Sequence, residues 1–278
     1  MTSDRPKGND SMINSTLSSL TSSDGSAIAV ETTGYGAPVI LIGGAFNDRS
    51  TVAALASTLA PRLTAVTYDR RGRGGSADLS GDYAIGREID DLATVIEHVG
   101  GTAGVFGHSS GAALALEGVL RGLPIERVAV YEMPAVVDGN RPEPPADVFH
   151  RLVARIEAGD LDAAAELFLT EQVGVPAPIV AGMRNSPVWE FLRAQAHSLP
   201  YDVAVCGSRL RLQTDRYATI DIPALVVNGD QTWPWIQTAA QALAAAIPAA
   251  RREVLSGEEH DILGKPARLE PLLTEFFS

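Results

Sequence analysis

The chain has 278 residues, which is enough for one large α/β domain or two smaller ones. Hydrophobic residues make up 45% and charged residues 20% of the sequence, as in ordinary globular proteins, and this excludes a fibrous or wholly disordered chain. The formal net charge of −12 argues against a nucleic-acid partner, because phosphate binding needs a basic surface.

The single cysteine and the hydropathy pattern argue against several further classes of protein. Cys206 has no second cysteine to pair with, so neither an internal disulfide nor a cysteine zinc site is available. No apolar run approaches the roughly 20 residues that span a bilayer, and the start of the chain lacks the apolar core of a signal peptide. We therefore expect a cytoplasmic protein that has no membrane partner and needs no metal or other cofactor.

Residues 1–21 are rich in Ser, Asn, Asp and Gly, a composition that predicts a flexible extension without a fold of its own. After it, short aliphatic runs alternate with helical patterns, which predicts an α/β fold with a mostly parallel sheet covered by helices. The expected strands are residues 27–32, 38–44, 63–69, 103–109, 127–133, 224–230 and 251–257. The expected helices are residues 51–60, 85–99, 110–121, 234–247 and 266–276.

The alternation stops in residues 134–221, where no convincing strand pattern occurs. Apolar residues recur at helical spacing over residues 148–156, and a second helix is expected after Asp160. A further helix is predicted to begin with Ser186 as N-cap and Pro187 at its first position. The expected organisation is a core of residues 22–133 and 222–278, interrupted by a helical cap of residues 134–221.

Residues 107–111, Gly-His-Ser-Ser-Gly, lie directly between an expected strand and an expected helix. A chain that turns from strand to helix within one residue strains that residue, and side chains two positions before and after it would collide with neighbouring backbone. Gly107 and Gly111 remove this collision. The pattern predicts that Ser109 is a nucleophile exposed at a sharp corner, and that the backbone N–H of Ser110 helps to bind an oxyanion.

A serine nucleophile needs a general base, usually histidine, and a carboxylate that orients the base. His260 follows an expected late strand in a loop before the last helix, where its imidazole can reach the sheet edge from which Ser109 emerges. Structural or surface roles fit the other four histidines better, and His197 in the cap is also a candidate for lining a pocket. These four are His98, His108, His150 and His197.

Two carboxylates are candidates for the partner of the histidine. Asp230 ends an expected strand, and the chain order Ser, Asp, His is typical of triads in this strand-turn-helix setting. Glu132 is the alternative, because it too closes an expected central strand. Asp230 is preferred, so the predicted triad is Ser109, His260 and Asp230.

With these residues, the chain resembles the α/β-hydrolase superfamily, and within it the capped branch of esterases, lactonases and cofactor-free haloperoxidase-like enzymes. The resemblance runs from about residue 26 to the end and is carried by the segments GHSSG, NGDQTWP, GEEHDIL and YDRRGRGGS. It implies the α/β-hydrolase fold with an inserted helical cap. The segment YDRRGRGGS, residues 68–76, is interpreted as a structural loop.

The resemblance also implies a second oxyanion donor and narrows the chemistry. Family members usually carry His-Gly after an early strand, and the next residue donates its N–H to the oxyanion. Here Gly43 and Gly44 stand at these positions, so Ala45 becomes that donor. Members that open epoxides or remove halides have aspartate as the nucleophile, and Ser109 excludes that route.

The sequence therefore predicts a serine hydrolase that cleaves a small to medium, largely apolar ester or lactone. Its partner is a small-molecule substrate, and a homodimer is left open. Candidates for an apolar pocket wall are Phe46, Trp189, Tyr201 and Trp233. The same triad also serves C–C bond hydrolysis, lyase chemistry and perhydrolysis, and the fold has been adapted as a small-molecule receptor with little turnover. The residues do not distinguish these alternatives.

Overall fold

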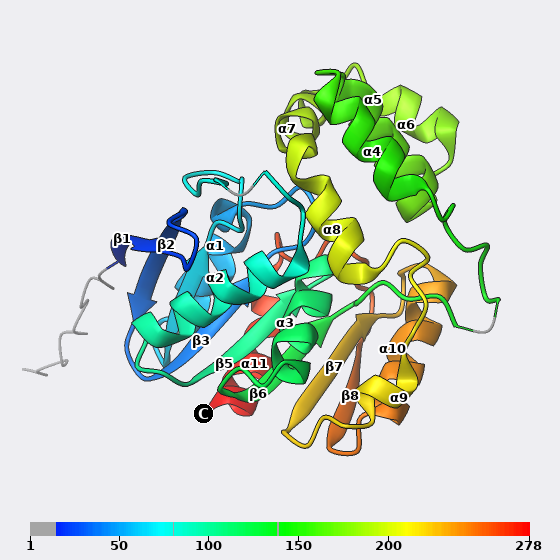
Figure 1. Cartoon of the computed structure of the whole chain (residues 1–278). Coiled ribbons are helices and arrows are strands. Elements are labelled where there is room, and N and C mark those ends of the chain that lie inside the picture. The colour runs from blue at the N-terminus through cyan, green and yellow to red at the C-terminus, as the bar shows by residue number, and fades with distance from the viewer. Residues whose placement is uncertain (1–14, 80, 138) are drawn as a thin grey trace, which may run out of the picture.

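The computed structural model describes residues 15–79, 81–137 and 139–278, and it is built around one eight-stranded sheet (Figure 1). The strands are β1 (Ser15–Thr21), β2 (Ala27–Gly34), β3 (Ala37–Ile42), β4 (Leu63–Tyr68), β5 (Ala103–His108), β6 (Ile125–Tyr131), β7 (Ala224–Gly229) and β8 (Ala250–Leu255). Their order across the sheet is β1-β2-β4-β3-β5-β6-β7-β8. Strand β2 runs antiparallel to both of its neighbours, and every other pair is parallel, so the expected mostly parallel sheet is confirmed.

The central strands are mostly apolar because helices cover both faces of the sheet. All residues of β5 and β7 are buried, and most of them are aliphatic or glycine. Parallel strands end at the same edge of a sheet, so the residues that follow β3, β5, β6 and β7 come together there. This edge carries the candidate site described below.

Five helices cover the sheet, and all five correspond to helices expected from the sequence. Helices α1 (Arg49–Leu59) and α11 (Pro266–Phe277) pack on one face through a core that includes Leu55 and Leu273. Helices α2 (Ile85–His98), α3 (Ser110–Leu120) and α10 (Pro234–Ala246) pack on the other through a core that includes Leu92, Leu116 and Leu243. None of the helices in residues 15–79, 81–137 and 139–278 combines the length and the apolar character that a membrane span requires.

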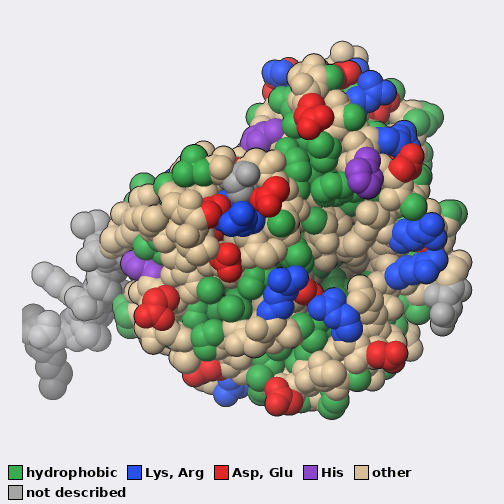
Figure 2. All heavy atoms as spheres, in the orientation of Figure 1, with side chains coloured by type: hydrophobic (Ala, Val, Ile, Leu, Met, Phe, Trp, Pro, Cys, Tyr) green, Lys and Arg blue, Asp and Glu red, His purple; other side chains and the backbone are tan. Residues whose placement is uncertain are grey.

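A helical insertion, residues 148–217, separates β6 from β7. It comprises α4 (Val148–Glu157), α5 (Leu161–Leu167), the π-helical turn η1 (Phe168–Val173), α6 (Ala177–Met183), α7 (Pro187–Gln195), the 3₁₀ turn η2 (Ala196–Ser198), α8 (Leu199–Cys206) and α9 (Thr214–Tyr217). Helices α4 to α7 form a lobe that projects from the rest of the molecule (Figures 1 and 2), and α8 descends from this lobe to pack on α3. Figure 2 also shows acidic and basic side chains interspersed over the visible face.

Two features, a strand and a helix cap, differ from expectation. Residues 15–21 form β1, so the prediction of a flexible extension is wrong for them, while residues 1–14 lie outside the described residues. As an edge strand, β1 exposes most of its polar side chains, and its composition therefore looks like that of a loop. Pro187 begins α7 as predicted, but the Ser186 hydroxyl donates to the Met183 carbonyl at 2.7 Å instead of capping the helix.

The contact between β5 and α3 leaves no room for a side chain at Gly107. A Cβ there would lie 2.3 Å from the Gly111 carbonyl oxygen and 2.6 Å from Ala112 Cα, both of them backbone atoms that cannot move independently. We expect Gly107→Ala to lower the free energy of unfolding by about 1–3 kcal/mol. Urea denaturation followed by circular dichroism measures this change.

Gly182 in α6 is the matched control, because nothing lies within 4 Å of a Cβ built there. Gly182→Ala should leave stability unchanged or raise it by up to about 1 kcal/mol, since alanine favours a helix interior. Equal stability of Gly107→Ala and the wild type would contradict the close packing of strand and helix.

Candidate active site

Ser109 lies at a sharp turn between β5 and α3, as the sequence predicts. Its backbone has φ 55° and ψ −121°, a strained conformation for a residue with a side chain. The N–H of Ser109 donates to the Tyr131 carbonyl at 2.9 Å, which ties the turn to the end of β6. At Gly111 a Cβ would lie 2.4 Å from the Ile42 carbonyl oxygen, so this glycine allows α3 to start close against β3.

The loop that follows β3 passes directly beside Ser109. A Cβ at Gly44 would lie 2.8 Å from Ser109 Cβ, so only glycine allows this approach. The N–H of Gly44 donates to Asn47 Oδ1 at 2.8 Å, which closes the loop on itself. Ala45 and Phe46 follow, and both line the same cavity as Ser109.

His260 is held by Glu132. The distance from His260 Nδ1 to Glu132 Oε2 is 2.7 Å, and the Glu132 side chain is fully buried, whereas the His260 side chain is 28% exposed. The carboxylate of Glu132 also accepts bonds from the Gly229 N–H at 2.8 Å and the Thr232 hydroxyl at 2.9 Å. With Nδ1–H donating to the carboxylate, Nε2 is left to act as a proton acceptor.

The prediction that Asp230 is the carboxylate on this histidine is wrong. Asp230 accepts bonds from the Gly257 N–H at 2.7 Å and the Gln231 side-chain amide at 3.0 Å, and so stabilises the turn that leads away from β8. The reason is the order of the strands: β6, which ends before Glu132, lies next to β5, which carries Ser109, whereas β7 is one strand further away. Glu132, the alternative acid, is the residue in contact.

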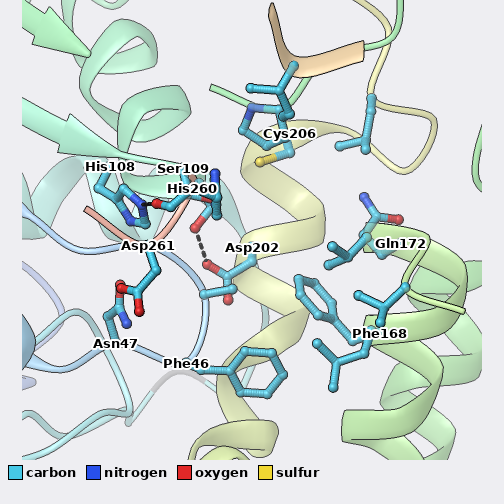
Figure 3. A pocket seen from close by; sticks show the side chains of 18 of the residues that line it. Phe46, Asn47, His108, Ser109, Phe168, Gln172, Asp202, Cys206, His260 and Asp261 are labelled. Atoms are coloured by element: carbon cyan, nitrogen blue, oxygen red, sulfur yellow. Dashed lines mark hydrogen bonds between the residues drawn. The ribbon is translucent and has the colours of Figure 1, made fainter. Parts of the chain in front are cut away.

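Ser109 and His260 line one cavity of about 300 Å³ that lies between the sheet edge and the helical insertion (Figure 3). The Ala45 and Ser110 positions expected for oxyanion donors lie in the same wall. Of the expected apolar wall, Phe46 and Trp233 line the cavity. The insertion contributes Phe168, Leu169, Gln172, Val173, Val175, Phe191, Leu192, Asp202, Cys206 and Leu210.

Trp189, Tyr201 and His197, the other candidates for lining a pocket, are not among the residues that line this cavity. Trp189 is 3% exposed and packs inside the insertion, where its indole N–H donates to Asp162 at 2.6 Å. The Tyr201 hydroxyl bonds to the loop after β4, and the His197 imidazole contacts backbone carbonyls. Tyr201 and His197 thus fix the insertion on the core, and Trp189 stabilises the insertion itself. Sequence spacing cannot separate these roles from lining a pocket.

Asp202 of α8 is a site residue that sequence analysis did not single out. Its carboxylate pairs with Arg70 at 2.8 Å and Arg73 at 2.7 Å. It also accepts a bond from the Ser110 hydroxyl at 2.6 Å, drawn as a dashed line at Asp202 in Figure 3. Arg73 also donates to the Gly44 carbonyl at 2.7 Å. The sequence signal that could have indicated such a carboxylate is the group of arginines that follows a buried strand. Buried arginines require carboxylates from elsewhere in the fold as partners.

Asp202, Arg70 and Arg73 form a buried cluster in which the arginines keep the carboxylate ionised. Burial by itself raises the pKa of Asp202, but the charges of Arg73 and Arg70 and the bond from Ser110 outweigh it, so the pKa lies below its usual range. Asp202 therefore stays ionised and remains an acceptor for Ser110, the residue next to the candidate nucleophile. This arrangement fixes the start of α3.

His108, beside Ser109, is buried and lines the same cavity. Its Nε2 lies 3.0 Å from the His260 carbonyl oxygen, so Nε2–H donates there, and its Nδ1 has no partner in the described structure. Burial, and secondarily the neighbouring His260, lowers the pKa of His108 to about 3. His108 is neutral at pH 7 and helps to hold the backbone of His260.

This lowered pKa predicts a pH dependence of stability. Between pH 6.5 and 3 the unfolded chain binds a proton at His108 that the folded chain does not, so stability falls as the pH falls, by up to about 1.4 kcal/mol per pH unit. We expect His108→Asn to lose about 1–2 kcal/mol less stability than the wild type between pH 7 and pH 5, as measured by urea unfolding. The matched control is His98→Asn, at an exposed histidine that ends α2, and it should retain the wild-type pH dependence. An unchanged slope in His108→Asn would show that His108 does not carry the effect.

No group of three or more His, Cys, Asp or Glu side chains within residues 15–79, 81–137 and 139–278 is placed to hold a metal ion. The chemistry available to this site from its own residues is that of a hydroxyl, an imidazole, a buried carboxylate and backbone N–H groups. These are the components of nucleophilic acyl transfer.

Comparison with known proteins identifies the family to which this fold belongs. A family model described as the alpha/beta hydrolase family matches residues 39–272. The structure is similar to that of an alpha/beta hydrolase from Sphaerobacter thermophilus, with 47% sequence identity and a TM-score of 0.87, over 94% of this chain and 100% of that one. The expected α/β-hydrolase fold is thereby confirmed.

More distant structures share the same architecture. A hydrolase from Pseudomonas aeruginosa is 25% identical with a TM-score of 0.74, and a thermophilic esterase from Thermogutta terrifontis is 23% identical with a TM-score of 0.73. Each alignment covers 94% of this chain and 97% of the other. The esterase, at this identity, indicates a common fold alone. No curated protein matches the chain by sequence.

Proposed function

Because the chain belongs to the alpha/beta hydrolase family, we propose that it is a serine hydrolase that cleaves a small to medium, largely apolar carboxylic ester or lactone through an acyl-enzyme. One observation carries the proposal: Ser109, on a strained turn, and His260, bonded to the buried Glu132 at 2.7 Å, line the same cavity. The triad is therefore Ser109, His260 and Glu132, in place of the triad with Asp230 expected from the sequence.

Acylation uses these three side chains in sequence. His260 Nε2 accepts the proton of the Ser109 hydroxyl as Oγ attacks the carbonyl carbon, and the π pair of the carbonyl moves onto its oxygen. Glu132 accepts the Nδ1–H bond and stabilises the imidazolium that forms. The intermediate then collapses: the bond from carbon to the leaving oxygen breaks, and that oxygen takes the proton from His260.

Deacylation repeats the cycle with water as the nucleophile. His260 accepts a proton from water as the water oxygen attacks the acyl carbon. The bond to Ser109 Oγ then breaks, and Oγ regains its proton from the imidazolium. The products are a carboxylic acid and an alcohol, or a single hydroxy acid when the substrate is a lactone.

Backbone N–H groups stabilise the oxyanion in both steps. The N–H of Ser110 belongs to the first turn of α3, where N–H groups have no partner within the helix and the helix dipole favours negative charge. The N–H of Ala45 comes from the loop whose Gly44 carbonyl is held by Arg73. Such preorganised donors contribute about 2.7–4 kcal/mol each in comparable enzymes.

The cavity supports an apolar substrate of limited size. Its volume of about 300 Å³ is at the lower end of the range for small-molecule sites. Phe46, Phe168 and Trp233 supply aromatic walls, and Phe46 and Phe168 pack edge to face at 5.4 Å. The insertion acts as a cap in this proposal, because it provides the wall opposite Ser109.

Removal of the Ser109 hydroxyl tests the proposal directly. We expect the wild type to hydrolyse p-nitrophenyl butyrate and Ser109→Ala to lose turnover by a factor on the order of 10⁶, because the nucleophile is absent. The initial rate of p-nitrophenolate release measures this. Circular dichroism of both proteins controls for folding, and equal rates would refute the role of Ser109.

A fluorophosphonate probe separates a hydrolase from a small-molecule receptor. The probe should label Ser109 of the wild type and leave Ser109→Ala unlabelled, as detected by the mass of the intact protein. Labelling with turnover supports the hydrolase. Labelling without turnover of any ester or lactone would favour a receptor, and no labelling would argue against an activated serine.

The two carboxylates are distinguished by matched amide substitutions. Glu132→Gln keeps the size of the side chain but removes the charge that holds the imidazole, so turnover should fall by a factor on the order of 10⁴. Asp230→Asn should keep turnover within about twofold, since Asp230 bonds to Gly257 and Gln231 and not to His260. The opposite ranking of the two variants would restore Asp230 as the acid.

A further inference from the structure

Gln172 is buried without a partner for its side-chain amide. The residue is 3% exposed, and neither Nε2 nor Oε1 has a hydrogen-bond partner. Among the described residues, Tyr68 and His108 each have one buried side-chain atom without a hydrogen-bond partner, and Gln172 has two. An unpaired buried amide costs free energy that an apolar side chain of the same size would avoid.

Gln172 belongs to the wall of the candidate active-site cavity. Gln172 lies in the π-helical turn η1 and lines the cavity from the insertion, across from Ser109 and His260 (Figure 3). Its neighbours Phe168, Leu169 and Val173 line the cavity as apolar side chains. The amide is therefore an isolated polar group in an apolar wall.

The backbone around Gln172 is held firmly. Arg141 donates to the Val173 carbonyl at 2.9 Å and to the Gln172 carbonyl at 3.3 Å. Gly174, with φ 87°, ends the turn. π-helical turns concentrate at functional sites because the extra residue reorients side chains. The position of the Gln172 amide is thus built into the fold and does not depend on a mobile loop.

The charged residues that line the cavity limit which ligand groups can bind beside Gln172. Its described lining residues include no Lys or Arg, so an anionic group would find no counter-charge. Of the two acidic lining residues, Asp202 is already neutralised by Arg70 and Arg73, and Asp261 lies beside Asn47, on the opposite side of the cavity from Gln172 (Figure 3). A cationic group beside Gln172 would therefore find no free carboxylate. A neutral group with both a donor and an acceptor is the complement of a primary carboxamide.

We propose that Gln172 is a specificity residue that binds an uncharged amide group on the substrate, at the opposite end of the cavity from the scissile carbonyl. The inference rests on the proposed hydrolase function and narrows it: the preferred substrate is an apolar ester or lactone with a second, amide-bearing end. Gln172 Nε2 donates to the amide carbonyl oxygen, and Oε1 accepts from the amide N–H. Neither bond takes part in the chemical step.

Two series of p-nitrophenyl esters test this inference in kinetics. In one series the acyl chain ends, after four to six methylenes, in a carboxamide, and in the other it ends in an isopropyl group of the same shape. Gln172→Met should lower kcat/KM for the best carboxamide ester about 10- to 100-fold relative to its isopropyl partner. The isopropyl series is the internal control, because mere repacking of the wall would change both series alike.

Equal discrimination between the two series in wild type and Gln172→Met would overturn the inference, since the amide of Gln172 would then bind nothing on the substrate. Leu169→Met, at another lining position of η1, is the control variant and should leave the discrimination unchanged. A loss of discrimination in both variants would also count against Gln172 as the specific contact.

A binding measurement keeps this test separate from the proposed function. If the wild type hydrolyses no ester in either series, the hydrolase proposal fails, but binding of 4-phenylbutanamide can still be followed by the fluorescence of Trp233 and Trp235, which line the cavity. The wild type should bind this amide about 10-fold more tightly than Gln172→Met does. Toluene, which has no amide, should bind to both proteins with equal affinity. Equal affinities for the amide, or no binding of it by the wild type, would overturn the role of Gln172.

Discussion

A buried carboxylate holds the site together. Asp202, near the middle of α8, pairs with Arg70 and Arg73 of the core and accepts a bond from Ser110. Removing one member of such a buried cluster costs about 3–5 kcal/mol, because the remaining charges are left without a partner. The insertion is therefore fixed on the core at the residue next to the candidate nucleophile, and Arg73 extends the same connection to the loop that carries Ala45.

Backbone strain is concentrated around the same cavity. The four described non-glycine residues with positive φ are Phe46, Ser109, Glu132 and Leu210. Three of them line the cavity, and the fourth, Glu132, bonds to His260. Strained residues persist only where the surrounding structure over-determines them, and here the buried ion cluster and the central strands provide that support. The strained residues Phe46, Ser109 and Glu132 therefore belong to the core side of the site, and the insertion provides the wall opposite Ser109.

Local patterns in the sequence predicted most elements of the core. Seven strands and five helices were expected from apolar runs and helical spacing, and each corresponds to an element of the structure. The turn at Ser109 was also predictable, because Gly107 and Gly111 are required by contacts with nearby backbone. The edge strand β1 was missed, since an edge strand that exposes polar side chains has the composition of a loop.

By itself, the sequence determined where strands and helices form and that Ser109 lies on a strained corner, because these features depend on the sterics of a few consecutive residues. Only the tertiary structure decided which carboxylate holds His260. Glu132 and Asp230 both follow strands, and the order of strands in the sheet brings Glu132 to the imidazole. The roles of Asp202 and Gln172 likewise depend on how the insertion packs on the core, which brings together residues far apart in the chain.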